Sequence, residues 1–325
     1  MKRRLVVPCV LILALQCVSD HDVTAEPLPV ATVEFDAPAV DRVMKYNIVV
    51  PAGYEESGQR YPVLYLLHGL TSNYTLWARM RVPEYAARYS MIVVMPDVGN
   101  SWYVNWAQSD DGQKNAWEDY MINDVIGHVD ANYRTIARRE GRAINGLSMG
   151  GYGALMLGLR HPEMFCSIGS HSGALAYAAG ARKRIENPEE TPSVRGRREP
   201  SEKDDKAIGI EGFSSQVDRY PAGKAFVTVE DCDQYDPFKL VLQVPKKELP
   251  HIHVDCGTED RLIETARQFA QVLQDNTISY SYAESAGRHW PIYWAREVAH
   301  SMTIQHNVIQ RNLAKLEENE QQAAR

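Results

Sequence analysis

Apolar and polar residues alternate in two short runs near the start of the chain. The runs cover residues 32–35 and 46–50, and the second ends at the Pro-Ala-Gly segment of residues 51–53. Alternation with a period of two places the apolar side chains on one face of an extended strand. The pattern predicts two half-buried antiparallel strands.

Continuous apolar runs follow at residues 62–67 and 91–96, and a glycine-bearing loop succeeds each of them. Strands that helices cover on both faces are apolar throughout, so these runs indicate buried strands of a parallel sheet. Residues 82–89 and 116–131 have the spacing of amphipathic helices. The alternating order predicts a mostly parallel, doubly wound α/β sheet flanked by helices.

The later part of the chain continues this order. The elements predicted there are strands at residues 143–145, 167–170, 252–256 and 278–282, and helices at residues 152–160, from 236 onward and 294–316. With 325 residues, 44% hydrophobic and 24% charged, the chain can bury the core of one large domain. We expect residues 26–325 to form it.

Residues 181–206 break the pattern, because they are rich in Arg, Lys, Glu, Asp and Pro and nearly devoid of apolar side chains. Such a segment cannot bury enough surface to order itself independently. We expect an insertion above the sheet over about residues 180–235. It is either a lid or, in its charge-rich first half, a solvated loop without function.

The amino terminus has the three-part layout of a secretory signal peptide. Basic residues 2–4 precede an apolar stretch over residues 5–15, and small or polar residues lead to Ala25. Cleavage after Ala25 would give a secreted or periplasmic protein; an uncleaved anchor or lipid attachment at Cys17 is the alternative. No later segment is apolar enough to predict a membrane span.

The net charge restricts the possible partners, and the cysteine count restricts the possible disulfides. A formal net charge of -7, spread along the chain, disfavours nucleic acid as a partner. Removal of residues 1–25 would leave Cys166, Cys232 and Cys256. Three cysteines permit at most one internal disulfide, and their spacing does not say which pair forms.

Residues 146–150 read Gly-Leu-Ser-Met-Gly and match G-x-S-x-G between a predicted strand and a predicted helix. In this motif the serine lies on a sharp strand-to-helix turn with strained backbone angles, where neighbouring side chains would collide with the strand and the helix. The turn lifts the hydroxyl above the sheet. The context predicts an α/β-hydrolase fold with Ser148 as a nucleophile.

A serine hydroxyl needs a base to remove its proton, and in this fold the base lies near the carboxyl end. His289 follows the last predicted strand and precedes the last helix, which is the expected loop. His300 and His306 fall within that helix and are expected at the surface. The sequence therefore predicts His289 as the base.

The base in turn needs a carboxylate that fixes its tautomer. Asp260 stands in the loop after the strand at residues 252–256 and gives the chain order Ser, Asp, His. Asp255 and Glu259 compete, but Asp255 lies inside the strand and Glu259 would point away if Asp260 points inward.

Two backbone N–H groups are expected to stabilise an oxyanion, those of Met149 and Leu70. Leu70 belongs to the loop of residues 68–70, where Gly69 lets the backbone pass close to a substrate. We expect His68 to support this loop by hydrogen bonds. His251, His253 and Asp255 share one strand face, but no further metal ligand is apparent, so packing or exposure is expected and no metal site.

Three motifs together resemble the esterase D family. They lie at residues 62–70, 146–154 and 257–260, and the resemblance covers roughly residues 46–172 and 251–302. Members include tributyrin esterases, S-formylglutathione hydrolases, feruloyl and acetylxylan esterases, and mycolyltransferases. The resemblance implies Ser148, His289 and Asp260 as the catalytic residues, the N–H groups of Leu70 and Met149 as the oxyanion hole, and no cofactor.

Two departures from the family affect substrate choice. Pro291 stands where relatives often have a tryptophan, with Trp290 one residue earlier, although Trp294 keeps its place. The charged insertion is also longer than in small esterases. We expect His68, Gly69, Trp290 and Trp294 to line the substrate site.

The resulting expectation is an exported serine carboxylesterase that acts on short-chain acyl esters. Acetylxylan or feruloyl esterase activity, S-formylglutathione hydrolase-like thioesterase activity and acyl transfer use the same chemistry and stay open. A different class, a non-catalytic binding protein on a hydrolase scaffold, would need no reactive serine. The partner is expected to be a small-molecule or carbohydrate-linked ester.

Overall fold

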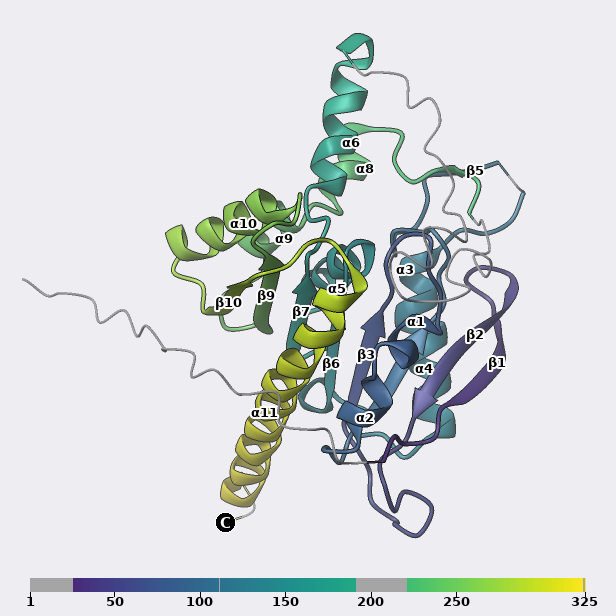
Figure 1. Cartoon of the computed structure of the whole chain (residues 1–325), viewed down its shortest axis with the longest axis vertical. Helices are drawn as coiled ribbons and strands as arrows, with labels where there is room; N and C mark the ends of the chain where they lie inside the picture. Colours follow the sequence, from purple (N-terminus) through teal and green to yellow (C-terminus); the bar gives the residue numbers. More distant parts are fainter. Residues whose placement is uncertain (1–25, 111, 191–220, 324) are drawn as a thin grey trace, which may run out of the picture.

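An eight-stranded sheet forms the centre of the protein (Figure 1), in the order β1-β2-β4-β3-β6-β7-β9-β10. The computed structural model describes residues 26–110, 112–190, 221–323 and Arg325. The strands are β1 (Ala31–Ala37), β2 (Arg42–Val49), β3 (Val63–Leu67), β4 (Ile92–Pro96), β6 (Arg142–Gly146), β7 (Ser167–His171), β9 (His251–Gly257) and β10 (Tyr280–Ser285). β1 and β2 pair antiparallel, β2 joins β4 antiparallel, and the six strands from β4 to β10 are parallel. The predicted mostly parallel α/β sheet is confirmed.

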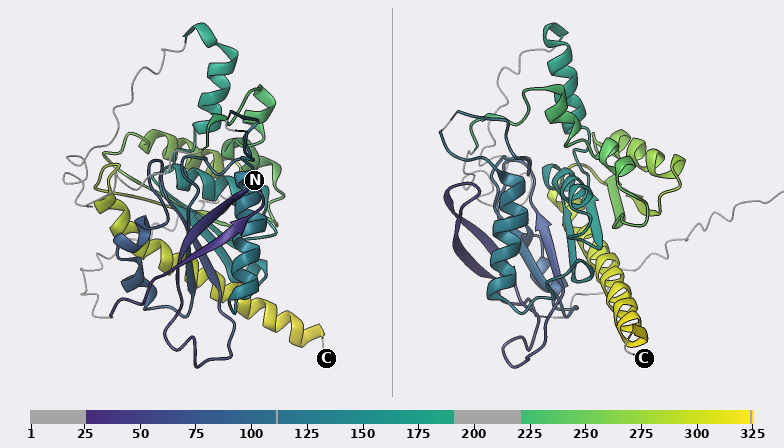
Figure 2. Two further views of the ribbon diagram at one scale, coloured as in Figure 1. Left: turned by 90° about the vertical axis from the view of Figure 1, so that its right-hand side faces the viewer. Right: turned by 180° about the vertical axis from the view of Figure 1, so that it is seen from behind.

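Helices cover both faces of this sheet. They are α1 (Leu76–Arg79), α2 (Val82–Ala86), α3 (Trp117–Asp119), the π-helix η1 (Tyr120–Val125), α4 (Ile126–Asn132), the 3-10 helix η2 (Arg139–Gly141), α5 (Met149–Arg160), α6 (Tyr177–Glu186), the 3-10 helix η3 (Pro188–Glu190), α8 (Val229–Asp233), α9 (Pro237–Gln243), α10 (Ile263–Asp275) and α11 (Pro291–Ala323). One buried cluster joins α1, α2 and α11 to the sheet, and the other joins α4, α5 and α10 to its opposite face. In Figure 2, α11 continues past the sheet to the carboxyl terminus.

Above the carboxyl ends of the strands stand α6 and α8 (Figure 1), beside a two-stranded sheet of β5 (Gln108–Ser109) and β8 (Gly223–Lys224). The first six residues of the predicted charge-rich segment, 181–186, are helical, which corrects the expectation that it would not order. Ala181 is buried, and Arg182 forms a 2.8 Å ion pair with Asp233 of α8. The rest of the predicted insertion from 191 to 220, like the predicted signal peptide of residues 1–25, lies outside the described residues.

Several element boundaries differ from the prediction. The final helix begins at Pro291 and runs to Ala323, beyond the predicted end at residue 316. Its last turns are rich in Glu, Gln and Ala, which favour helix without an apolar stripe, so apolar spacing alone ended the prediction too early. β10 begins two residues later than predicted, α2 stops at Ala86, and the helix predicted from residue 116 contains the π-helical turn η1.

The three cysteines outside the predicted signal peptide are free and buried. Burial raises the pKa of Cys166 and Cys256 to about 12 and that of Cys232 to about 11, so all three are neutral thiols at physiological pH. Within the described ranges, no helix is both long enough and apolar enough to cross a membrane.

Candidate active site

Ser148 lies on the turn between β6 and α5, at the carboxyl edge of the sheet. Its backbone angles are φ 54° and ψ −115°, a strained conformation for a residue with a side chain. Its N–H donates to the carbonyl oxygen of His171 at 2.9 Å, which ties the turn to the end of β7. The predicted strained strand-to-helix turn is therefore present.

The two glycines of the motif permit a close backbone approach. A Cβ at Gly146 would lie 2.4 Å from the carbonyl group of Gly150, and a Cβ at Gly150 would lie 2.4 Å from the carbonyl oxygen of Leu67. Real Cβ atoms do not approach backbone so closely. Alanine at either position would push the helix away from the strand and displace Ser148.

His289 and Asp260 meet the serine in a continuous chain of hydrogen bonds. His289 Nε2 lies 2.9 Å from Ser148 Oγ, and His289 Nδ1 lies 2.8 Å from Asp260 Oδ2. The ring of Trp294 packs edge-on against the imidazole at a centroid distance of 4.9 Å. The geometry fits a neutral imidazole that accepts the serine proton at Nε2 while Nδ1–H donates to the carboxylate.

Asp260 is buried and remains ionised. Burial by itself would raise the pKa of its carboxyl group, but hydrogen bonds from His289, the Leu262 N–H and the Ser172 hydroxyl hold that pKa below its ordinary value. Asp260 can therefore orient the imidazole and stabilise the cation formed when His289 accepts a proton.

The loops that carry Asp260 and His289 are joined backbone to backbone. The Glu259 N–H donates to the carbonyl oxygen of Gly287 at 2.9 Å, and a Cβ at Gly257 would lie 2.4 Å from that oxygen. The Glu259 side chain is exposed and pairs with Arg288, so it points away from His289 as the sequence predicted.

The loop after β3 passes close to the nucleophile. A Cβ at Gly69 would lie 2.7 Å from Leu147 Cδ1 and 3.4 Å from Ser148 Cβ. The adjoining Thr71 N–H donates to Asn100 Oδ1 at 2.8 Å, which fixes the far end of this loop. Met149 is the first residue of α5, so its N–H has no acceptor inside the helix. The Gly69 backbone thus lies beside Ser148, and an oxyanion hole formed by the N–H groups of Leu70 and Met149 stays a prediction.

His68 supports this loop rather than facing Ser148. Its Nε2 accepts a hydrogen bond from the Val98 N–H at 3.2 Å, and its Nδ1 lies 2.8 Å from the carbonyl oxygen of Gly69. The Tyr103 hydroxyl donates to the carbonyl oxygen of His68 at 2.9 Å. This is the supporting role predicted from the sequence; contact of His68 with substrate stays a prediction.

The two tryptophans after the base have different surroundings. Trp294 is buried behind the imidazole, whereas Trp290 is 46% exposed and adjoins Ile292, which is 80% exposed. Contact of Trp290 with substrate stays a prediction. His300 is exposed and His306 is half-buried on α11, near the surface as expected.

The strand residues His253 and Asp255 are both buried, and His253 Nε2 lies 3.1 Å from Asp255 Oδ2. His251 is only half-buried. Packing or exposure was the expectation for this alternating set, and the structure shows packing for His253 and Asp255. Among the described residues, no group of three His, Cys, Asp or Glu side chains could hold a metal ion.

Sequence reasoning missed the residues that brace the site from behind. Ser172 follows β7 with φ 46° and hydrogen-bonds Asp260, and Asn100 and Tyr103 hold the loop of residues 68–71. Their position just after buried strands was a usable signal, because side chains at the carboxyl ends of parallel strands converge.

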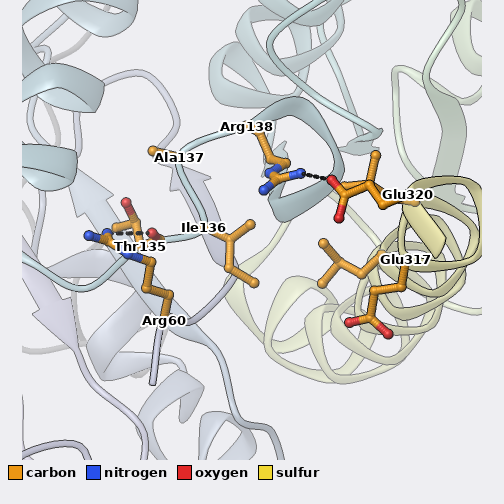
Figure 3. Close-up of a pocket in the computed structure, with 9 residues that line it drawn as sticks. Arg60, Thr135, Ile136, Ala137, Arg138, Glu317 and Glu320 are labelled. Carbon is orange, nitrogen blue, oxygen red and sulfur yellow. Dashed lines mark hydrogen bonds and ion pairs between the residues drawn. The ribbon is translucent and has the colours of Figure 1, made fainter. Parts of the chain in front are cut away.

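A surface pocket of about 530 Å³ lies at the opposite end of the sheet (Figure 3), against the last turns of α11. Arg60, Ile136 and Leu313 are among its lining residues, and Arg138 pairs there with Glu320 at 3.2 Å. These segments precede β3 and β6, whereas Ser148 follows β6, so the pocket is remote from Ser148.

Comparison with known proteins points to an esterase. The model of a family described as "Putative esterase" matches residues 37–302. An acetyl esterase of Caldicellulosiruptor saccharolyticus is 29% identical over 241 residues, which cover 73% of this chain and 80% of the relative. An esterase of Mycobacterium tuberculosis is 39% identical over 130 residues, but the match covers 39% of this chain and only 28% of that relative's length.

A solved structure agrees in fold. An S-formylglutathione hydrolase from Staphylococcus aureus superposes with a TM-score of 0.64 over 86% of this chain and 98% of its own, at 21% identity. At that identity the likeness shows the α/β-hydrolase fold alone.

Proposed function

The chain belongs to this esterase family, and from that premise we propose that it hydrolyses short-chain acyl esters through an acyl-enzyme on Ser148. The observation that carries the proposal is the hydrogen-bonded chain from Ser148 through His289 to Asp260, at 2.9 and 2.8 Å. No cofactor takes part in the proposed chemistry.

In the acylation step, His289 Nε2 accepts the Ser148 proton as Oγ attacks the ester carbonyl carbon. The N–H groups of Leu70 and Met149 stabilise the oxyanion. When the intermediate collapses, the carbon–oxygen bond to the alcohol breaks and His289 returns the proton to the departing alcohol. Water then repeats the sequence on the acyl-enzyme, and the products are a carboxylic acid and free Ser148.

Asp260 acts on His289 and not on substrate. Its carboxylate holds Nδ1–H and stabilises the imidazolium in both steps. The lowered pKa of Asp260 supports this role, because the carboxyl group stays ionised throughout the pH range in which an imidazole titrates.

The test is hydrolysis of p-nitrophenyl acetate and butyrate by the purified protein. We expect turnover that Ser148→Ala abolishes. Absence of turnover by folded protein, or undiminished turnover in the variant, rejects the proposal. Labelling by a fluorophosphonate probe separates an enzyme from a binding protein, since a binding protein without a reactive serine stays unlabelled.

Carbohydrate-linked acetyl esters are the second candidate substrates. The acetyl esterase relative, matched over 73% of this chain, favours the acetyl group, and the proposed export favours a polysaccharide as the carrier of the ester. Release of acetate from acetylated xylan, measured beside release of ferulate from feruloylated xylan, would distinguish acyl preference on a polymer. Thioesters and alcohol acceptors belong in the same panel, with S-formylglutathione and an added alcohol as the probes.

Export is proposed on the layout of residues 1–25 alone. The protein would then act outside the cytoplasm, which disfavours a cytosolic thioester as its substrate. Sequencing the amino terminus of the protein from its producing cells tests this: a mature chain that begins at Glu26 supports cleavage, and an intact Met1 in the cytoplasmic fraction contradicts it.

A further inference from the structure

A second buried carboxylate, Asp255, lies five residues before Asp260 on β9. Its Oδ2 lies 2.6 Å from His171 Nδ1 and 3.1 Å from His253 Nε2, and its Oδ1 accepts a hydrogen bond from the Tyr293 hydroxyl at 3.0 Å. Burial opposes ionisation, but the neighbouring histidines hold the pKa of Asp255 far below its ordinary value. The group is therefore a buried anion in close contact with two histidine nitrogens and with one hydroxyl that donates to it.

The first of these contacts leads to the nucleophile. The His171 ring rests on Asp255 at one nitrogen, while Nε2 lies 3.0 Å from both Asn145 Nδ2 and Ser301 Oγ. The carbonyl oxygen of the same residue accepts the Ser148 N–H at 2.9 Å. A shift of His171 would move the acceptor that holds the strained turn.

The contact between Asp255 and Tyr293 leads to His289, the proposed base. Tyr293 lies in the first turn of α11, and its N–H donates to the carbonyl oxygen of Trp290, the residue after His289. Its ring also lies under the base loop, because a Cβ at Gly287 would be 2.4 Å from Tyr293 Cδ2. The hydrogen bond from the Tyr293 hydroxyl to Asp255 therefore fixes the position of the Tyr293 ring, against which the His289 loop packs.

The backbone of Asp255 leads to Asp260, the third residue of the proposed catalytic chain. Its carbonyl oxygen accepts the Ser172 N–H at 2.8 Å, in a residue held at φ 46°. The hydroxyl of Ser172 hydrogen-bonds Asp260. Asp255 is thus connected to Ser148 through His171, to Asp260 through Ser172, and to the loop of His289 through Tyr293, which contacts Trp290 and Gly287.

We propose that Asp255 is a positioning residue that sets the mutual geometry of Ser148, His289 and Asp260 through His171, Tyr293 and Ser172. This rests on the proposed function. Asp255 touches no substrate. It acts because an ionised carboxylate with several close polar contacts resists displacement, and because a misplacement near 1 Å in a catalytic group can slow a reaction about a hundredfold.

The variant that tests this role is Tyr293→Phe, which removes the hydroxyl that contacts Asp255 and Ser285 and keeps the ring under the base loop. The matched control is Tyr46→Phe in β2, where a buried tyrosine hydroxyl bonds His128 Nδ1 at 3.0 Å on a strand away from the site. Both variants lose a buried tyrosine hydroxyl together with its hydrogen bonds. Only Tyr293→Phe loosens the His289 loop.

We expect Tyr293→Phe to lower kcat on p-nitrophenyl acetate about tenfold with KM within about threefold of wild type. The acid limb of its kcat/KM profile should move to lower pH, because a loosened His289–Asp260 bond stabilises the imidazolium less. Ser172→Ala should behave in the same way. Tyr46→Phe should keep both kcat and the pH profile, whatever its loss of thermal stability.

The rate of labelling by a fluorophosphonate gives a second readout that needs no substrate. Slowed labelling in Tyr293→Phe but not in Tyr46→Phe supports the inference. Equal kcat, pH profile and labelling in wild type and Tyr293→Phe overturns it while leaving the proposed function intact. A wild type that neither hydrolyses esters nor becomes labelled overturns both.

Discussion

The Ser–His–Asp arrangement of Ser148 at the carboxyl edge of the sheet resembles a buried one that joins Ser301 of α11 to the sheet. In the Ser148 arrangement, His289 bridges Ser148 and Asp260 at 2.9 and 2.8 Å. In the Ser301 arrangement, His171 lies 3.0 Å from Ser301 Oγ and 2.6 Å from Asp255 Oδ2. The distances are nearly the same in both.

The surroundings of the two serines differ. Ser148 is half-buried on a strained turn at the amino end of α5, with the Gly69 backbone beside it. Ser301 is completely buried in the middle of α11, and its hydroxyl donates to the carbonyl oxygen of Val298. Backbone N–H groups in the middle of a helix are engaged within the helix and cannot stabilise an oxyanion.

The comparison separates triad geometry from catalytic capability. Three side chains at hydrogen-bond distance suffice to build a rigid polar cluster in a core. A nucleophile additionally needs access, a backbone that presents its hydroxyl and donors for the developing negative charge. Four experiments test this difference between the two sites.

The largest expected effect is that of the nucleophile. Ser148→Ala should lower kcat about a millionfold, the loss typical of a serine hydrolase without its serine. Ser301→Ala, the same change in the buried arrangement, should lower kcat less than about tenfold, because Ser301 only supports the His171 ring. Steady-state kinetics on p-nitrophenyl butyrate measures both, and equal losses would erase the distinction between the two serines.

The carboxylate of the Ser148 arrangement comes next. Asp260→Asn should keep the fold and lower kcat about ten thousandfold, because an amide stabilises the wrong tautomer of His289. Circular dichroism checks the fold and a pH–rate profile checks the residual activity. A loss below about tenfold would mean that another group orients the base.

A smaller effect is expected at the loop beside the nucleophile. Gly69→Ala should lower kcat about a hundredfold, since the new Cβ would lie 2.7 Å from Leu147 Cδ1 and displace the backbone that borders Ser148. Gly58→Ala on an open stretch is the control, because a Cβ there meets no atom within 4 Å. Comparable kcat in the two variants would contradict the role of this loop.

The buried carboxylate should affect stability in a pH-dependent way. Asp255→Asn should cost about 3 kcal/mol of unfolding free energy near pH 7, because the amide removes a buried carboxylate and leaves the polar groups around it without their acceptor. The folded pKa of Asp255 lies below its ordinary 3.8, so its stabilisation is present above that value and disappears as the pH falls through the folded pKa.

Urea titrations of wild type and Asp255→Asn at several pH values check this sign. The difference in unfolding free energy should stay constant between about pH 5 and 8 and shrink below about pH 4. A difference that grows on acidification would show that Asp255 is protonated in the folded protein.

The sequence predicted the parts of this molecule that obey local rules. Apolar runs located the buried strands. G-x-S-x-G located the turn, because the close backbone contacts at Gly146 and Gly150 leave no room for a Cβ. Chain order and loop position were enough to select His289 and Asp260, which the structure brings together with Ser148.

The sequence could not predict contacts between distant strands. His253 and Asp255 were expected either to pack or to be exposed, and the sequence did not identify their partners Ser281 and Tyr293, which come from other elements. The end of α11 was misjudged because its last turns carry helix-forming residues without an apolar stripe. The position of Ser172 just after a buried strand indicated that it could lie near the site, but the sequence did not say that its hydroxyl would reach Asp260.

The most direct test of the central claim is to locate the acyl group during turnover. The protein is mixed with p-nitrophenyl acetate, quenched in acid within the first turnover and digested for mass spectrometry. We predict one acetyl group on the peptide that contains Ser148 and none on the peptide that contains Ser301. Ester hydrolysis without acetylated Ser148, or acetyl on another residue formed at the rate of turnover, would contradict the account.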